Sequence, residues 1–376
     1  MKIKANVATD MLVMTSALPQ DAKYADNTNL YPYRKNEYET SWEEYMKHWI
    51  TGAAAALSIG LSPNASTAET IRVTLQLPET HSLGVNWNDF ADIIEEKSGG
   101  ELKVQLFPSA QLFKDKEVPG AVGSGAVEAG SAFIGRFAGS VPAVDVVSIP
   151  FIFGSEEHIR AAVAPGSDLR KTIDNAILDE TNNKVLWWQA FGRNIYLNNG
   201  AAIQTPADIA DKKVRTYGKV HGWTVQALGG APTLMSGSKQ FLAYQQGAVD
   251  VGMTGASAVK SRKLHEVMDH MTLTFDSAIE FIAVINNDFY EGLSAEHKRI
   301  IDAAAIEVEK KLREEIYAQE AAIVEEMKSN MTVVDLTGDQ RSKWVEATSG
   351  VVDRFIEETG ETGASAVAAV KAAMTN

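Results

Sequence analysis

The chain contains no cysteine, which excludes disulfide bonds, thiolate metal sites and thiol nucleophiles. Basic residues are also outnumbered, with 35 Lys and Arg against 49 Asp and Glu, so the formal net charge is -14. This charge argues against a nucleic-acid partner, which needs a basic face. It still permits an anionic ligand, because cations gathered locally in a cleft decide such binding.

Motifs of the common enzyme classes are missing as well. No phosphate-binding loop or Gly-x-Ser-x-Gly elbow occurs, Gly123–Gly125 lacks the third glycine of a dinucleotide fingerprint, and His265 and His270 miss the zincin spacing by one residue. Ser236 and Lys239 match a Ser-x-x-Lys nucleophile pattern, but its companion motifs are absent and the segment also fits a turn with a helix cap. We therefore expect no enzyme, cofactor or metal site, with an exported serine hydrolase as the alternative.

Long apolar runs are scarce, and the notable one lies near the start. Residues 46–68 combine a basic beginning, an apolar stretch and small residues before Ala68, which is typical of a secretory signal peptide and too short to span a membrane. We expect cleavage near Ala68 and translation from Met46. Residues 1–45 would then be a non-native or unstructured upstream extension. A genuinely long leader and a buried helix are the alternatives.

A chain of 376 residues exceeds one ordinary core and suggests about two domains. After the leader, the residue pattern predicts a strand over 71–77, a helix over 84–97 and a strand over 102–107. This order implies a parallel strand pair with a right-handed crossover. Helices over 339–358 and 364–374 are expected to end the chain.

Two six-residue segments repeat a pattern. Residues 125–130 read Gly-Ala-Val-Glu-Ala-Gly, and residues 247–252 read Gly-Ala-Val-Asp-Val-Gly. Each follows an expected helix, and its first glycine can end that helix in the left-handed conformation and lead into a strand. Unless chance explains it, the repeat predicts two similar α/β lobes. The strand ends at 131–133 and 254–257 would face the cleft between them.

Arg215 is the leading candidate for a ligand contact. It lies in an alternating stretch over 213–217 that predicts a strand, near the carboxyl end. Ligands of open α/β sheets bind at the carboxyl ends of strands, and the planar fork of a guanidinium matches a carboxylate. The alternative is an ordinary surface ion pair.

Two features suit a hinge between lobes. Arg193 and Asn194 follow a strand expected over 184–190, at a bend that Gly192 permits. A helix over 295–329, uninterrupted by proline or glycine, would be about 50 Å long and could lie across both lobes.

Seven stretches together match a known family: 108–112 (Pro-Ser-Ala-Gln-Leu), 125–130, 149–153 (Ile-Pro-Phe-Ile-Phe), 205–215, 228–232 (Leu-Gly-Gly-Ala-Pro), 246–250 (Gln-Gly-Ala-Val-Asp) and the long helix. Their order and spacing resemble the solute receptors of tripartite ATP-independent periplasmic (TRAP) transporters, in their dicarboxylate-receptor-like family, over essentially the whole mature chain. The resemblance implies two α/β lobes joined by crossing strands and a long helix. Such receptors close on a small organic anion in the cleft between the lobes.

The resemblance assigns roles to individual residues. It makes Arg215 the main carboxylate clamp and Arg193 a less secure match, because the spacing between the two is longer than usual. Thr254 stands where many members have asparagine, and the Glu-Trp pair of the metal-assisted keto-acid binders is missing, so no metal-bridged ligand is expected. The other positions expected at the ligand are Asn194, Ser131, Phe133 and Lys116, the last where some sialic-acid binders have arginine.

The resemblance also implies domains and partners. Lobe I would comprise 69–192 and 281–320, and lobe II 193–280 and 321–376. The protein would be a periplasmic receptor that delivers a small carboxylate to a TRAP membrane permease. A receptor of another transporter class with the same two-lobed plan is a further alternative.

Overall fold

A computed structural model describes residues 68–373. The expected upstream extension and nearly all of the expected signal peptide lie outside the described residues. Among the helices of residues 68–373, none combines the length and the apolar character that a membrane crossing requires. The strands are β1 (Glu69–Leu75), β2 (Leu102–Phe107), β3 (Ala129–Phe133), β4 (Asn183–Asn198), β5 (Lys213–Thr216), β6 (Ala231–Leu234), β7 (Val251–Gly255), β8 (His270–Leu273), β9 (Ala278–Asn286) and β10 (Thr332–Asp335).

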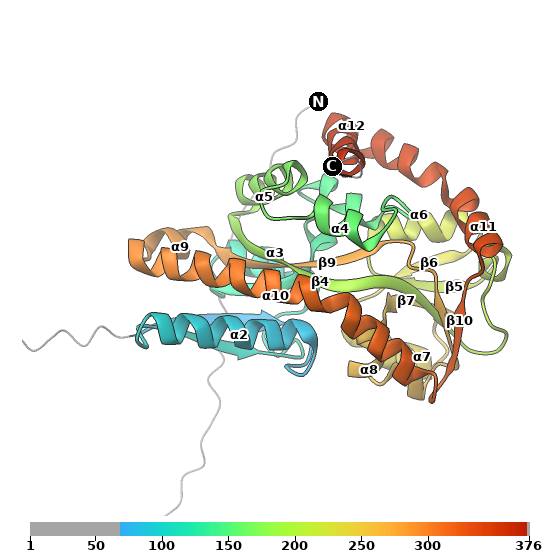
Figure 1. Ribbon diagram of the computed structural model, residues 1–376, viewed down its shortest axis with the longest axis horizontal. Helices are drawn as coiled ribbons and strands as arrows, with labels where there is room; N and C mark the ends of the chain where they lie inside the picture. The colour runs from blue at the N-terminus through green and yellow to red at the C-terminus, as the bar shows by residue number, and fades with distance from the viewer. Residues whose placement is uncertain (1–67, 374–376) are drawn as a thin grey trace, which may run out of the picture. The chain divides into compact units, whose positions relative to one another are not determined.

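The helices surround these strands (Figure 1). The α-helices are α2 (Ser82–Lys97), α3 (Val118–Gly123), α4 (Glu156–Ala162), α5 (Asp168–Thr181), α6 (Lys219–Ala227), α7 (Gln240–Gln245), α8 (Ala256–Ser261), α9 (Asn287–Gly292), α10 (Ala295–Met327), α11 (Gly338–Thr348) and α12 (Gly350–Ala372). The 3-10 helices are η1 (Asp115–Glu117), η2 (Ile134–Phe137), η3 (Pro142–Ser148), η4 (Pro206–Ile209), η5 (Gly237–Lys239) and η6 (Leu264–Glu266).

The strand β4 joins two halves of the sheet system. Strand order along the main path is β2-β1-β3-β9-β4-β7-β5-β6, and β8 pairs with β4 and with β10. The first part of β4, from Asn183 to Arg193, pairs antiparallel with β9, whereas Asn194 to Asn198 pair antiparallel with β7. The polypeptide therefore passes from one half to the other without leaving the strand.

The repeated segments at 125–130 and 247–252 adopt the same structure, as predicted. Their first glycines follow α3 and α7 with left-handed φ angles of 75° and 63°. Glu128 accepts a hydrogen bond from a β1 backbone N–H at 3.0 Å, and Asp250 accepts one from a β5 backbone N–H at 2.8 Å. The strands that follow pair in parallel, β3 with β1 and β7 with β5. Each half therefore contains the same helix, glycine and acid-tethered strand.

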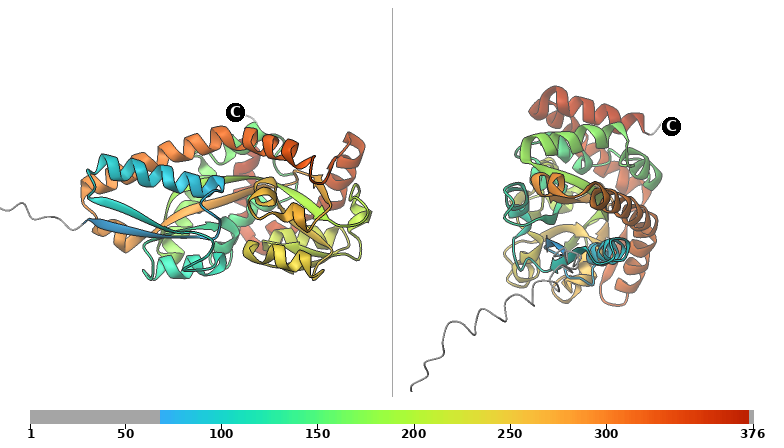
Figure 2. Two further views of the ribbon diagram at one scale, coloured as in Figure 1. Left: turned by 90° about the horizontal axis from the view of Figure 1, so that it is seen from below. Right: turned by 90° about the vertical axis from the view of Figure 1, so that its left-hand side faces the viewer.

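The long helix α10 is confirmed. Its 33 residues span about 50 Å. Ser294 caps its start by accepting the His297 N–H at 3.0 Å, and its buried side includes Ile300, Val308 and Ile316. It contacts α2, β4 and α8, and Figures 1 and 2 show α2 alongside its first half. The helix is thus in contact with both halves.

Two predicted boundaries are wrong. The strand expected over 184–190 continues to Asn198, because β-bulges at Val185/Trp187 and Ala190/Gly192 absorb the bend. Arg193 and Asn194 therefore lie within β4 rather than after it. The C-terminal helices divide at Ser349, and Gly360 with φ 64° makes a kink inside α12 instead of an end.

Candidate functional site

A small cavity lies where the two halves meet. Its volume is about 30 Å³. One wall comes from Gln76, which follows β1, and from η1, β3 and η2. The opposite wall comes from β5, η5, α7, β7 and Arg262, which follows α8, and the connecting strands β4 and β9 complete the lining. Three residues expected at the ligand, Arg215, Phe133 and Thr254, line it. The cavity thus lies beside the carboxyl ends of β1, β3, β5 and β7, where ligands of α/β sheets bind.

Arg215 projects into this cavity from β5 and is 2% exposed. Its Nε and Nη2 donate to the Met235 carbonyl at 3.1 and 2.9 Å, and Nη1 donates to the Met253 carbonyl. The Gln240 amide, oriented so that both groups are satisfied, accepts from Nη2 at 3.1 Å. All these acceptors are neutral, and no Asp or Glu of the described residues forms an ion pair with Arg215. Burial consequently lowers the pKa of the guanidinium.

Arg136 and Asp115 form an ion pair on the opposite wall. Neither was a candidate from the sequence. Asp115 accepts from the Arg136 Nε and, at 3.1 Å, from the Phe133 backbone N–H, so both of its oxygens are engaged. The pair is electrically balanced and holds η1 against the end of β3.

Arg262 is a second cation at the cavity, partly buried, that the sequence analysis missed. It follows α8, and its Nη2 is buried without a hydrogen-bond partner. The guanidinium packs on Gly237, where a Cβ would lie 2.6 Å from Nη1. Burial, with repulsion from Arg215, lowers the pKa of Arg262 to about 10, so it stays charged at neutral pH. The signal available was its position one short helix beyond the strand end at Thr254.

Histidines near the cavity add no positive charge at neutral pH. Burial, aided by Arg262, lowers the pKa of His81 to about 3. Burial and Arg215 lower the pKa of His221 to about 3 as well. The charge of the cavity is therefore set by three arginines and one aspartate.

Arg193 and Asn194 do not line this cavity. The Arg193 Nε donates to Glu320 at 2.7 Å, and its Nη1 pairs with Glu156 at 2.9 Å. Asn194 donates to Asp276 at 2.8 Å, and burial raises the pKa of this aspartate to about 6. Arg193 is thus already paired inside the protein, and direct ligand contacts for both residues stay predictions.

The structure places two more expected residues away from the cavity. Ser131 lies in β3 and donates to the Gln189 side chain at 2.5 Å. Lys116 is exposed, whereas its neighbour Asp115 lines the cavity. Ligand contacts of Ser131 and Lys116 also stay predictions.

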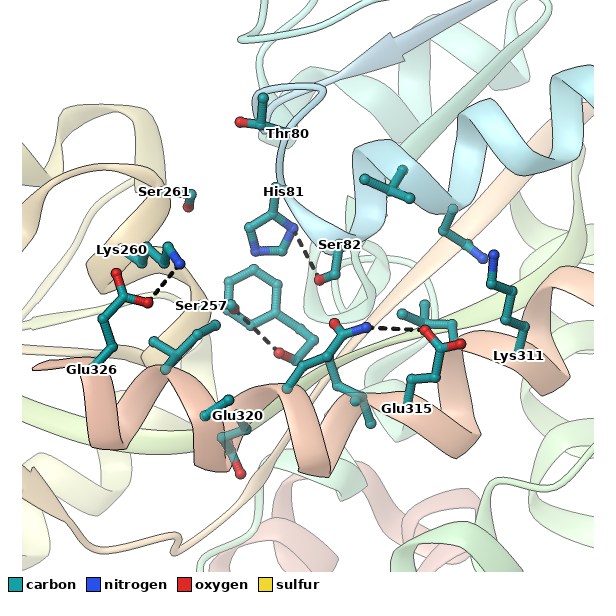
Figure 3. A pocket seen from close by; sticks show the side chains of 18 of the residues that line it. Thr80, His81, Ser82, Ser257, Lys260, Ser261, Lys311, Glu315, Glu320 and Glu326 are labelled. Atoms are coloured by element: carbon teal, nitrogen blue, oxygen red, sulfur yellow. Dashed lines mark hydrogen bonds and ion pairs between the residues drawn. The ribbon is translucent and has the colours of Figure 1, made fainter.

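A larger pocket of about 590 Å³ lies between the start of α2, α8 and α10 (Figure 3). Its lysines face acids on neighbouring elements: Lys311 lies 2.8 Å from Asp89, and Lys260 lies 2.6 Å from Glu326. These ion pairs balance the charge around much of the pocket. It is therefore a weaker candidate for an anion than the smaller cavity.

Comparison with known proteins identifies the family. Residues 74–359 match the bacterial extracellular solute-binding protein family 7. The chain belongs to this family. One relative in it is the C4-dicarboxylate-binding periplasmic protein DctP of Rhodobacter capsulatus, 28% identical over 85% of this chain and 96% of that protein. Another is the 2,3-diketo-L-gulonate-binding periplasmic protein YiaO of Escherichia coli K12, 25% identical over 86% and 96%.

Solved structures of TRAP periplasmic solute-binding proteins share the fold. A TRAP periplasmic solute-binding protein from Polaromonas sp. JS666, bound to D-erythronate, has a TM-score of 0.75 and 26% identity over 81% of this chain and 98% of that one. One from Roseobacter denitrificans, bound to β-D-glucuronate, has a TM-score of 0.75 and 25% identity over 81% and 99%. The predicted two-lobed α/β fold and the TRAP receptor family are thereby confirmed. The exact lobe boundaries stay a prediction.

The hydrolase alternative fits a family 7 protein poorly. Ser236 Oγ lies 3.3 Å from Ser238 Oγ, and Lys239 is exposed. The Lys239 backbone N–H donates to the Ser236 carbonyl at 3.1 Å, as in a turn, but none of the described hydrogen bonds joins the two side chains. The family is one of solute-binding receptors, not enzymes. Within residues 68–373, no group of three or more His, Asp or Glu side chains is placed to hold a metal ion.

Proposed function

We propose that this protein is a periplasmic receptor that binds a small organic acid in the cavity between its lobes and delivers it to a TRAP membrane permease. One observation carries the proposal: Arg215 is a buried guanidinium at a strand end with only neutral acceptors around it. The relatives add support, since one is named for C4-dicarboxylates and a structural neighbour holds D-erythronate.

A ligand carboxylate would bind Arg215 more strongly than its present partners do. Hydrogen bonds between a guanidinium and a carboxylate are charge-assisted and bidentate, whereas the Met235 and Met253 carbonyls are uncharged. The exchange would also cancel a buried positive charge. Phe133 and Tyr217, whose rings pack edge to face at 5.1 Å, would cover the apolar part of the ligand.

Lobe movement accompanies binding in this proposal. The cavity of about 30 Å³ has room for about one water molecule, so an organic acid enters when the lobes are further apart. Ligand contacts to both walls would then favour closure by population shift. The bulge at Gly192 in β4 and the ends of β9 are the places where backbone dihedrals can change.

The proposal includes export and a membrane partner. The expected signal peptide at 46–68 would direct the chain to the periplasm, as the names of the relatives indicate for those proteins. Sequencing the N-terminus of the secreted protein tests this. A start near Glu69 is expected, and a mature chain that retains residues 1–45 would contradict it.

An organic-acid library screened by thermal shift, followed by calorimetry, tests the function. For the tightest ligand, Arg215→Ala should weaken binding at least about thirtyfold, because truncating a buried charged anchor costs about 2 kcal/mol or more. Arg299→Ala is the matched control, since Arg299 is exposed on α10 and pairs with Glu296 in the same helix. Unchanged affinity in folded Arg215→Ala would overturn the role of Arg215.

A further inference from the structure

The cavity contains more positive charge than one carboxylate can balance. Arg136 enters from one lobe, and Arg215 and Arg262 enter from the other. Asp115 is the carboxylate that lines the cavity with them. Its oxygens are occupied by Arg136 and by the Phe133 N–H, so the charge of Asp115 is already matched. Two guanidinium charges therefore remain.

The two remaining cations differ in how far the protein satisfies them. Arg215 has carbonyl and amide acceptors on three sides. Arg262 Nη2 is buried with no acceptor, and none of the described ion pairs includes Arg262. An unsatisfied buried donor costs free energy, and two like charges in one cavity repel. Without a ligand, this arrangement raises the free energy of the folded protein. Anionic groups bound at the two guanidinium groups would lower it.

Gly237 makes the position of Arg262 possible. The Cβ of any other residue there would lie 2.6–2.8 Å from the guanidinium atoms. The absence of a side chain at Gly237 thus lets the Arg262 guanidinium approach the η5 backbone closely at the cavity. The same segment follows Met235, whose carbonyl holds Arg215. One loop therefore positions both cations.

We infer that the ligand carries two anionic groups, one held by Arg215 and the other by Arg262, and that Arg262 sets this requirement. The inference rests on the proposed function, because it concerns the same cavity. A ligand with one carboxylate would leave one guanidinium of the cavity without a counter-charge. A second carboxylate, sulfonate or phosphate would satisfy it and would also meet the free Nη2 donor.

Calorimetry with matched ligands tests the requirement. The probes are dicarboxylates of different lengths, hydroxylated dicarboxylates, sulfo- and phosphocarboxylates, the monoamide of each dicarboxylate, and the monocarboxylates D-erythronate and D-glucuronate. The tightest dianion should bind the wild-type protein at least about thirtyfold more tightly than its own singly charged analogue, as expected when one partner of a buried charge pair is removed. A monoanion that binds as tightly as every dianion would overturn the inference and leave the proposed function intact.

Variants locate the requirement in Arg262. Arg262→Gln should reduce the preference for the dianion to less than about threefold, mainly by weakening the dianion, because the monoanion makes no contact that is lost. Arg262→Lys should retain part of the preference, and Arg299→Gln should retain all of it. An unchanged preference in Arg262→Gln would overturn the assignment of this residue.

A stability measurement separates ligand binding from a structural role. Without ligand, Arg262→Gln should melt at the same temperature as the wild-type protein or higher, because the substitution removes a partly buried, unpaired charge with an unsatisfied buried donor. A structural role for Arg262 would instead lower the melting temperature, and that result would overturn the inference. If no acid in the panel binds the wild-type protein, the proposed function itself fails.

Discussion

The buried arginines beside the long helix differ from those in the cavity. Beside α10, three arginines each meet a glutamate within hydrogen-bond distance, whereas Arg215 and Arg262 meet no carboxylate among the described residues. Two of the glutamates belong to α10, and for the third pair α10 supplies the arginine. The pairs are Arg170 with Glu309 at 2.6 Å, Arg193 with Glu320 at 2.7 Å, and Arg313 with Glu280 at 2.6 Å.

The difference separates structural charges from functional ones. A buried ion pair contributes little net stability over an apolar pair, but breaking it leaves a buried charge and is expensive. The α10 pairs therefore fix the helix to α5, β4 and β9. A buried cation without an acid lacks a counter-charge inside the protein, which makes it a candidate to bind an anionic ligand. This distinction cannot be seen from residue type alone.

The largest expected effect comes from breaking an α10 pair. Burial opposes the charge of Arg313, but Glu280 raises the pKa of its guanidinium overall. Arg313→Met would leave Glu280, 1% exposed, without its partner and should lower the free energy of unfolding by about 3 kcal/mol in urea titrations. The double variant Arg313→Met/Glu280→Gln should recover part of this loss. If Arg313→Met lowers the free energy of unfolding by less than about 1 kcal/mol, the pair is no more important than an exposed one, and the proposed contrast between paired and unpaired arginines fails.

An intermediate effect on stability is expected at Asp145, a buried carboxyl that has no ion-pair partner among the described residues. Its Oδ1 is buried without a partner, and burial raises the pKa of this carboxyl to about 7. The folded protein therefore retains a proton that the unfolded chain releases near pH 4, so stability should fall as the pH rises from about 4 to 7. Asp145→Asn should be more stable than wild type at pH 8 by about 2 kcal/mol. It should lose the share of the pH dependence that Asp145 contributes, while Asp276, whose pKa burial raises to about 6, keeps its own share.

Thermal melting at pH 5 and pH 8 checks this expectation. Asp179→Asn, an exposed substitution on α5, is the control and should keep the wild-type pH dependence. If Asp145→Asn and the wild-type protein show the same pH dependence, the carboxyl does not bind a proton on folding.

The smallest effect is expected for an exposed pair at the larger pocket. Lys260 and Glu326 lie 2.6 Å apart, with side chains about half exposed at 52% and 48%. Solvent screens such a pair, so Lys260→Ala should change the free energy of unfolding, measured by urea titration, by no more than about 0.5 kcal/mol. The change should be smaller still in high salt. A loss above about 1.5 kcal/mol would show that exposed and buried pairs differ less than proposed.

The sequence predicted the parts of the molecule that depend on local pattern. The left-handed glycines at 125 and 247, the strand that carries Arg215 and the length of α10 all follow from residue order, and the structure confirms them. The strand β9, buried at every position, was missed, because its mostly apolar residues do not alternate with polar ones and a short apolar run does not distinguish a strand from a buried helix.

Contacts between distant segments could not be predicted in the same way. Arg193 and Arg215 both looked like cations at strand ends, but Glu320 lies 127 positions beyond Arg193 and only the fold brings them together. Arg262 follows the short helix α8, and its burial depends on how η5 packs against it. Whether a charge is paired is thus a property of tertiary structure.

The passage of β4 through both halves has a consequence for modularity. Each half depends on one part of the same strand, with β9 hydrogen-bonded to the first part and β7 to the second. A fragment containing one half alone would either lack part of its sheet or carry an unpaired length of β4 that invites aggregation. The two lobes therefore cannot be exchanged or expressed as independent modules, and a ligand bound between them should protect both against proteolysis together.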